Sequence, residues 1–202
     1  GKTSGIAGSY AQLNSTGNTV ALTGNTVNLN GGHASWVFGA QATDTTTGST
    51  STITVTGNTV NLKQSPGSIG SVCGGEIEVN SGFSGTATIA GNTLNLNGGS
   101  CSSVYGGKST GTGVTVRDNI INWTGSIVSG TIYGGIGTVC TGNTLNVKGI
   151  GLTAENLSNF STINYMLPAS TADGTTVITL TGTEGTDLTG TTVNVDTTGA
   201  SS

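Results

Sequence analysis

Short segments in which apolar and polar residues alternate recur along the whole chain. The most regular of them begins with Gly-Asn-Thr or a close variant and places a pair of apolar side chains on one face. These pairs are Val27 and Leu29, Val60 and Leu62, Leu94 and Leu96, Ile121 and Trp123, and Leu145 and Val147. Alternation with period two, in segments rich in Thr and Val, is typical of β-strands.

Two further segments of the same kind accompany each Gly-Asn-Thr segment, so each repeat predicts three strands. Their apolar columns are Ile6, Val37, Val72, Val104 and Ile132 in one, and Val55, Ile89, Val116 and Cys140 in the other. Equivalent positions keep the same type of side chain, as parallel in-register stacking requires. We therefore predict an all-β fold, a parallel β-solenoid with three faces and about six coils. A β-sandwich is the alternative, because Gly-Asn dipeptides also suit hairpin turns.

Asparagine recurs at one position of the Gly-Asn-Thr segments, at Asn18, Asn25, Asn58, Asn92, Asn119 and Asn143. We expect these residues at turns, where Asn tolerates left-handed backbone geometry. Identical amides stacked at the spacing of neighbouring strands can hydrogen-bond along the solenoid, so we predict a structural ladder through Asn25, Asn58, Asn92, Asn119 and Asn143. A second column falls on the outward face by alternation: Asn28, Asn61, Asn95, Asn122 and Asn146.

The composition narrows the possible functions. Gly, Thr, Ser and Asn supply more than half of the 202 residues, and charged residues only 7%. So few long side chains exclude a helical bundle, and the regular apolar pattern argues against disorder. The net charge of −4, without a basic cluster, argues against nucleic-acid binding. With His33 as the one histidine and few carboxylates, we expect no metal site, no cofactor and no enzymatic activity.

One column of larger side chains is predicted to point outward, one residue after the inward Val/Ile column: Phe38, Cys73, Tyr105 and Tyr133. Its rings could form a platform for sugar rings or for a hydrophobic protein partner. Alternatively, the rings stack on one another or lie under the loops. We expect Trp36 and Trp123 to pack in the core or at corners, and take Phe38, Tyr105 and Tyr133 as the candidate partner-binding residues.

Catalysis would require clustered acids, or calcium with a basic residue, in one groove, as in polysaccharide lyases and glycosidases. Glu76, Lys108, Arg117 and Asp118 are the residues that could lie within a few coils of each other. We expect no pair of carboxylates on one solvent face. Among the cysteines, a Cys73–Cys101 disulfide is left open, and Cys140 is expected to be a buried free thiol.

The units GNTVNLNGG and SVYGGKS, and above all the tail from Asn156 to Val195, resemble passenger domains of type V autotransporter adhesins of diderm bacteria. The resemblance covers residues 5–196. It implies a right-handed parallel β-helix exported through the outer membrane by a C-terminal β-barrel that this sequence does not contain. The solenoid repeats would occupy residues 1–152, and residues 153–202 would form the final coil or cap and continue the passenger.

Within this tail, residues 153–160 predict a short helical turn capped by Thr153, followed by strands near 161–167, 176–181 and 191–195. The chain starts without the apolar region of a signal peptide, so we expect residue 1 to be an internal cut in a longer protein.

The expected function is therefore that of a stalk on the bacterial cell surface that mediates adhesion or self-association. Its partner would be a host-cell or bacterial surface protein, a glycan or a second copy of itself, with the membrane reached only through the barrel. A carbohydrate-active β-helix enzyme is the alternative.

Overall fold

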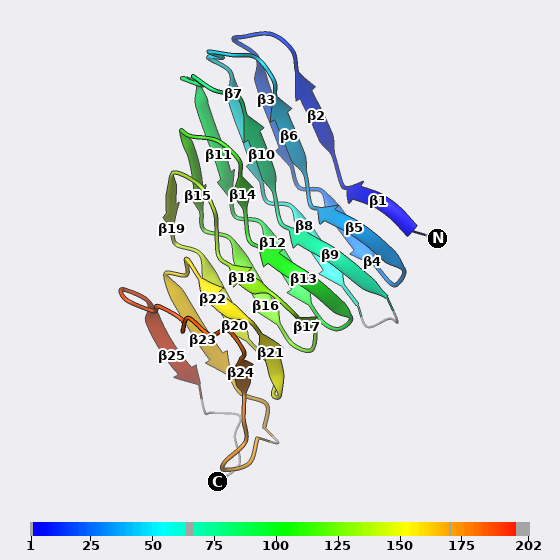
Figure 1. The fold of residues 1–202 in the computed structure, drawn as a ribbon, viewed down its shortest axis with the longest axis vertical. Helices are drawn as coiled ribbons and strands as arrows, with labels where there is room; N and C mark the ends of the chain where they lie inside the picture. The colour runs from blue at the N-terminus through cyan, green and yellow to red at the C-terminus, as the bar shows by residue number, and fades with distance from the viewer. Residues whose placement is uncertain (1, 64–66, 170, 197–202) are drawn as a thin grey trace.

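The chain winds into a stack of about six coils in which neighbouring strands run parallel (Figure 1). The computed structural model describes residues 2–63, 67–169 and 171–196. Within these ranges it contains β-strands and no helix. All pairings between the described strands are parallel, which excludes a β-sandwich built from hairpins. The predicted parallel β-solenoid is confirmed.

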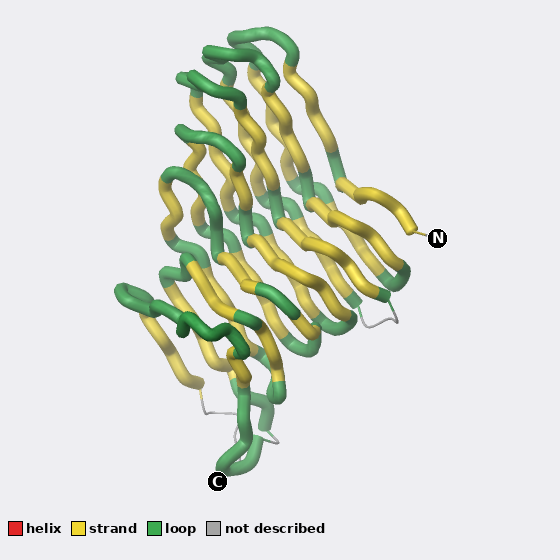
Figure 2. The backbone as a smooth tube through the Cα atoms, in the orientation of Figure 1, coloured by secondary structure: helices red, strands yellow, loops and turns green. Residues whose placement is uncertain are grey.

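Each of the first four coils has four strands, one more than the repeats predicted. The strands of successive coils form four main sheets, named A to D here, and the chain passes through them in the order A, B, C, D. A fifth sheet in the tail has two strands. Figure 2 shows the turns gathered at the ends of the strands. The additional strand belongs to sheet B and follows directly after sheet A.

The strand bounds are as follows. Sheet A contains β1 (Lys2–Ala7), β5 (His33–Phe38), β9 (Ser68–Cys73), β13 (Ser100–Tyr105), β17 (Ile127–Val128), β18 (Thr131–Tyr133) and β22 (Asn156–Ser158). Sheet B contains β2 (Tyr10–Leu13), β6 (Gln41–Asp44), β10 (Glu76–Val79) and β14 (Lys108–Ser109). Sheet C contains β3 (Thr19–Thr23), β7 (Thr52–Thr56), β11 (Thr86–Ala90), β15 (Val114–Arg117) and β19 (Val139–Thr141). Sheet D contains β4 (Thr26–Leu29), β8 (Thr59–Leu62), β12 (Thr93–Leu96), β16 (Ile120–Trp123), β20 (Thr144–Val147), β23 (Thr162–Met166) and β25 (Thr192–Asp196).

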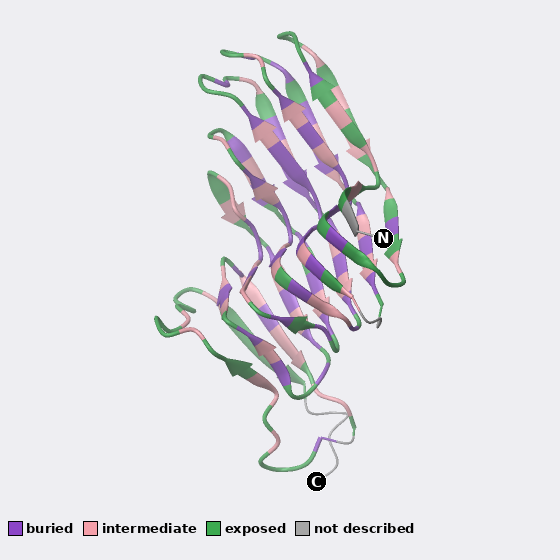
Figure 3. Ribbon diagram, turned by 45° about the vertical axis from the view of Figure 1, so that its right-hand side comes forward, coloured by how far each residue is buried: buried purple, intermediate pink, exposed green. Residues whose placement is uncertain are grey.

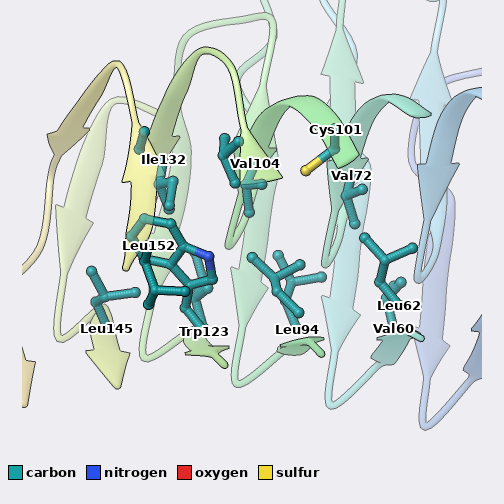
Figure 4. Close-up of a cluster of buried hydrophobic side chains, with 14 of the residues drawn as sticks. Val60, Leu62, Val72, Leu94, Cys101, Val104, Trp123, Ile132, Leu145 and Leu152 are labelled. Carbon is teal, nitrogen blue, oxygen red and sulfur yellow. The ribbon is translucent and has the colours of Figure 1, made fainter. Parts of the chain in front are cut away.

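The four sheets enclose two adjoining apolar clusters. Sheet A packs against sheet D, and Figure 4 shows their side chains, Val104 and Leu94 among them, pointing toward one another. Sheet B packs against sheet C, with Ile77 and Ile89 in the second cluster. Buried and more exposed residues alternate along the strands in Figure 3. The inward columns follow the predicted register, and Leu96 is fully buried as expected.

Two kinds of glycine shape the bends between sheets. Gly57 has a φ of 66° just before a ladder asparagine, a left-handed conformation that glycine adopts at no steric cost. Asp118 takes the same conformation in one coil, with a φ of 57°. The asparagines of the ladder do not adopt it, so the expectation that they supply the left-handed residue was wrong. At the junction of sheets A and B, a Cβ on Gly74 would lie 2.4 Å from the carbonyl oxygen of Gly106.

A ladder of asparagines, all buried except the half-buried Asn25, runs through the junction of sheets C and D. The side-chain Nδ2 of each donates to Oδ1 of its neighbour in the next coil, at 2.7 Å for the first pair and 3.0 Å for the others. The members are Asn25, Asn58, Asn92, Asn119 and Asn143. Asn18 lies outside this ladder, because its segment forms β3 in sheet C and its backbone N–H donates to Ser51.

A second ladder runs along the outer face of sheet D and has the opposite direction. Here Nδ2 of each asparagine donates to Oδ1 of its neighbour in the preceding coil, at 2.7–3.0 Å. The members are Asn28, Asn61, Asn95, Asn122, Asn146, Asn164 and Asn194. Asn164 and Asn194 extend the column beyond the predicted residues.

The tail continues the solenoid with strands. The expected helical turn at 153–160 was wrong, because β21 (Leu152–Ala154) and β22 occupy this segment. β22 pairs with β18, and β21 pairs with β24 (Ile178–Leu180). Strands β23, β24 and β25 lie where the three tail strands were expected.

Candidate functional site

The predicted outward column lies on sheet A at its junction with sheet B. Phe38, Cys73, Tyr105 and Tyr133 follow one another in register through β5, β9, β13 and β18. Tyr105 and Tyr133 are half-buried and stack with ring centroids 5.2 Å apart and nearly parallel planes. Phe38 and Cys73 are buried. In this column, therefore, only the two tyrosine rings lie at the surface, and Phe38 and Cys73 are covered.

Trp36 stands on this outer surface, whereas it had been expected in the core or at a corner. Its side chain is 38% exposed. Its indole stacks with the ring of Phe38, with centroids 5.9 Å apart and planes 5° from parallel. Trp123, by contrast, is fully buried in the cluster between sheets A and D, and its Nε1 donates to the backbone oxygen of Ser126.

An ion pair between a half-buried lysine and a buried glutamate borders the rings. Nζ of Lys108, on β14, lies 2.7 Å from Oε1 of Glu76, on β10. Gln41, on β6, donates from Nε2 to the other carboxylate oxygen of Glu76 at 2.9 Å. Nζ of Lys108 also lies 4.8 Å from the ring centroid of Trp36 and 5.6 Å from that of Tyr105, within cation–π range. The pair thus joins sheet B to the rings of sheet A.

Burial controls the ionisation of this cluster. It raises the pKa of Glu76, and the hydrogen bonds and charge of Lys108 offset only part of that effect. Burial alone would lower the pKa of Lys108, but the Glu76 carboxylate raises it above its ordinary value. Burial also raises the pKa of the Cys73 thiol strongly. Lys108 therefore stays protonated at neutral pH, and Cys73 stays a thiol.

Two hollows, each of about 420 Å³, flank Trp36. The first is lined by His33, Ala34, Ser35, Trp36, Ser68, Gly70, Ser71 and Ser102. The second is lined by Ser4, Gly5, Trp36, Phe38, Gln41, Glu76, Glu78 and Lys108. The first is therefore rich in hydroxyl groups, whereas the second contains two carboxylates and an ammonium group. The indole of Trp36 forms part of both walls.

The four candidate catalytic residues separate into two pairs. Glu76 and Lys108 lie on sheet B, while Arg117 and Asp118 pair with each other at the junction of sheets C and D. Glu76 and Glu78 both line the second hollow, although the side chain of Glu76 is only 2% exposed and its carboxylate is paired with Lys108. Among the residues that the structure describes, no group of His, Cys, Asp and Glu side chains could hold a metal ion. The described residues also contain no helix that could span a membrane.

The three cysteines are free. The register neighbour of Cys73 in the next coil is Tyr105, whereas Cys101, four residues earlier on the same strand, pairs with Ile69. Cys73 and Cys101 therefore do not face each other in register. Cys140 is only partly buried, so its predicted full burial was wrong. β19 is the last strand of sheet C, and sheet B ends with β14 before it can cover Cys140 completely.

The sequence patterns missed Gln41 and the exposure of Trp36. A usable signal for Gln41 was its position after a small-residue pair, since Gln41, Glu76 and Lys108 each follow Gly-Ala or Gly-Gly. Their register across sheet B places the three side chains in one column. For Trp36 the signal was the size of its neighbours, since Gly5 and Ser71 occupy the same position in adjacent coils.

Comparison with known proteins identifies no relative of this chain. No protein-family model, no curated protein and no solved structure matches it.

Proposed function

We propose that this chain is a non-enzymatic, surface-exposed stalk that mediates adhesion or self-association, as part of the passenger domain of a type V autotransporter of a diderm bacterium. The observation that carries the proposal is a regular stack of coils bearing aromatic rings on one outer face. The stack supplies rigidity and length, and the rings supply contact surface. The resemblance of the repeats and the tail to such passengers suggests the bacterial cell surface as the location.

The low charge of the chain affects how such a stalk would bind. With only 7% charged residues it has little long-range attraction for a partner. Contacts would come from rings and polar side chains, each weak but multiplied along many copies on a cell. The partner would be a surface protein, a glycan or a second copy of the chain.

The environment of Glu76 supports a non-enzymatic function. Both oxygens of its carboxylate already accept hydrogen bonds, and its side chain is 2% exposed. Glu78 accepts a hydrogen bond from Thr43. A glycosidase needs one carboxyl group free to donate a proton and a second free to act on sugar or water.

The test is adhesion of cells that display the complete protein. Replacing Phe38, Tyr105 and Tyr133 with Ser should reduce adhesion, because aromatic residues contribute disproportionately at interfaces. A double variant, with Tyr105 and Tyr133 replaced by Ser and the buried Phe38 retained, distinguishes the loss of exposed contact surface from a loss of core packing. Thr54, Thr88 and Thr115, on the outer face of sheet C, provide a matched triple replacement by Ser that should leave adhesion unchanged. Unchanged adhesion in a folded aromatic variant would contradict the assignment of binding to these rings.

An enzymatic assay tests the alternative. The purified chain should release neither reducing ends nor unsaturated products from polysaccharides. Turnover that is lost in Glu76→Gln would overturn the non-enzymatic proposal.

A further inference from the structure

Trp36 has neighbours in its column that are too small to cover its ring. Gly5 precedes it and Ser71 follows it in register, and Ser103 comes next. In a parallel stack, large side chains usually lie against equivalent ones in the next coil, as Tyr105 does against Tyr133. The indole instead rises from a floor of small residues, and Phe38 and Lys108 are its contacts on the side of sheet B.

The hydroxyl-rich hollow borders the same indole on the side toward the start of β5. Ser35, Ser68, Ser71 and Ser102 bring hydroxyl groups from three successive coils. Among the side chains that the structure describes, no carboxylate or ammonium group lines this hollow, and His33 is the one titratable side chain there. The hollow thus combines a flat aromatic wall with uncharged groups that can both donate and accept hydrogen bonds.

These properties match a pyranose ring. A sugar ring presents C–H groups on its flatter face, which favour the electron-rich face of an aromatic ring, and hydroxyl groups around its edge. A neutral sugar leaves no charge to be desolvated without a partner. The neighbouring hollow holds Glu76 and Glu78 against Lys108, an excess of negative charge that disfavours an acidic sugar.

We propose that the hollow formed by Trp36 and the serines of β5, β9 and β13 binds a neutral pyranose unit of a glycan. Trp36 is the stacking residue, and the serine hydroxyls hydrogen-bond the edge of the sugar. This site deepens the proposed adhesive function and rests on it for its biological role. The binding itself can be measured without any adhesion assay.

The binding experiment uses the fluorescence of the two tryptophans. Trp123 is fully buried with its Nε1 hydrogen-bonded, so a change caused by a sugar reports on Trp36. The full chain is titrated with neutral hexasaccharides of glucose, N-acetylglucosamine, mannose and galactose, and with hexagalacturonate as the acidic counterpart. At least one neutral hexasaccharide should change the emission, and hexagalacturonate should bind at least about tenfold more weakly.

Variants of Trp36 then assign the site. Trp36→Ala should weaken binding of the neutral sugar at least about tenfold in a competition assay, whereas Trp36→Phe should weaken it less because a ring remains. Tyr10→Ala is the matched control, since Tyr10 is an exposed aromatic residue that lines neither hollow. Circular dichroism checks that each variant keeps its strands.

Three results would overturn the inference: no binding of any neutral hexasaccharide, equal binding by folded Trp36→Ala, or a preference for hexagalacturonate. Failure of the adhesive function can be told apart from failure of the glycan site. If Trp36→Ala loses sugar binding while cells displaying it still adhere, adhesion stands but does not depend on this glycan site. If the wild-type chain binds the sugar and displaying cells do not adhere, the glycan site stands and the adhesive function is wrong.

Discussion

A buried asparagine in the middle of the stack satisfies groups in both neighbouring coils. Oδ1 of Asn92 accepts from the backbone N–H and from Nδ2 of Asn58. Its own Nδ2 donates to Oδ1 of Asn119 and to the backbone oxygen of Val55. Because these groups are shielded from water, one amide prevents several buried polar atoms from losing their partners.

Asn92→Ala should therefore destabilise the protein by about 1–3 kcal/mol for each buried group left without a partner. Thermal and chemical unfolding measure the loss. Asn143→Ala is the matched comparison, because Nδ2 of Asn143 already lacks a hydrogen-bond partner at the end of the ladder. We expect it to cost less. Equal melting temperatures for wild type and Asn92→Ala would show that the ladder adds no stability.

Asp44 should make the stability of the protein sensitive to acid. Burial alone would raise the pKa of Asp44, but hydrogen bonds from Ser49 and Thr46 hold it below its ordinary value. A carboxyl whose pKa is lower in the folded state stabilises the fold above its unfolded pKa of about 3.9, and this stabilisation is lost as the pH falls through the folded value. Denaturant midpoints should therefore fall with pH below about 5 more steeply in wild type than in Asp44→Asn. Parallel curves would contradict this role.

The cysteines should differ in reactivity, because the attacking species is the thiolate. Burial raises the pKa of Cys101 to about 12 and that of Cys73 still further, so neither should react with a thiol reagent at pH 8 in the folded protein. Cys140, which is partly buried, should react slowly. Titration should detect at most one thiol in the native state, none in Cys140→Ser, and three after unfolding. Rapid reaction of all three in the native state would show that the core is open.

At the level of the strand, register decides which side chains are buried. In β12, Leu94 and Leu96 face the core while Asn95 lies on the outer ladder. The same alternation holds in β8 and β20, their counterparts in sheet D. A shift by one residue would exchange the two faces of such a strand.

Leu96→Asp should consequently unfold the middle coils, because the buried carboxylate would have no partner. Protease resistance and soluble yield are the measurements. Asn97→Asp, one residue further on at an exposed position, should leave both unchanged. A soluble, resistant Leu96→Asp protein would be incompatible with the inward position of Leu96.

The sequence pattern predicts strands well where a column repeats in every coil and poorly elsewhere. Sheets A, C and D have long apolar columns, such as Val37, Val72 and Val104. Sheet B has Ala42, Ile77 and Ser109 in one register, so its alternation carries little apolar signal. The tail segment 153–160 contains capping residues typical of a helix, but parallel pairing with the preceding coil determines its structure.

At the scale of the whole molecule, the solenoid could be predicted because identical coils reinforce one another's pattern. The candidate site could be predicted only in part, because it depends on unlike residues from different sheets. Tyr105 and Tyr133 belong to a repeated column, but Lys108 of sheet B reaches the rings of Trp36 and Tyr105 only across the bend between sheets A and B. That bend depends on close backbone approach at glycines such as Gly74, which period-two alternation does not encode.

The opposite directions of the two asparagine ladders have an electrostatic consequence. Amides aligned head to tail add their dipoles, as the peptide groups of a helix do. The inner row points its N–H groups toward the C-terminal end of the stack, and the outer row points them toward the N-terminal end. Either row alone would leave a partial positive charge at one end of the stack and a partial negative charge at the other. Because the two rows run in opposite directions, these end charges offset each other. A stalk with this pattern therefore carries little net dipole from its ladders, whatever its length.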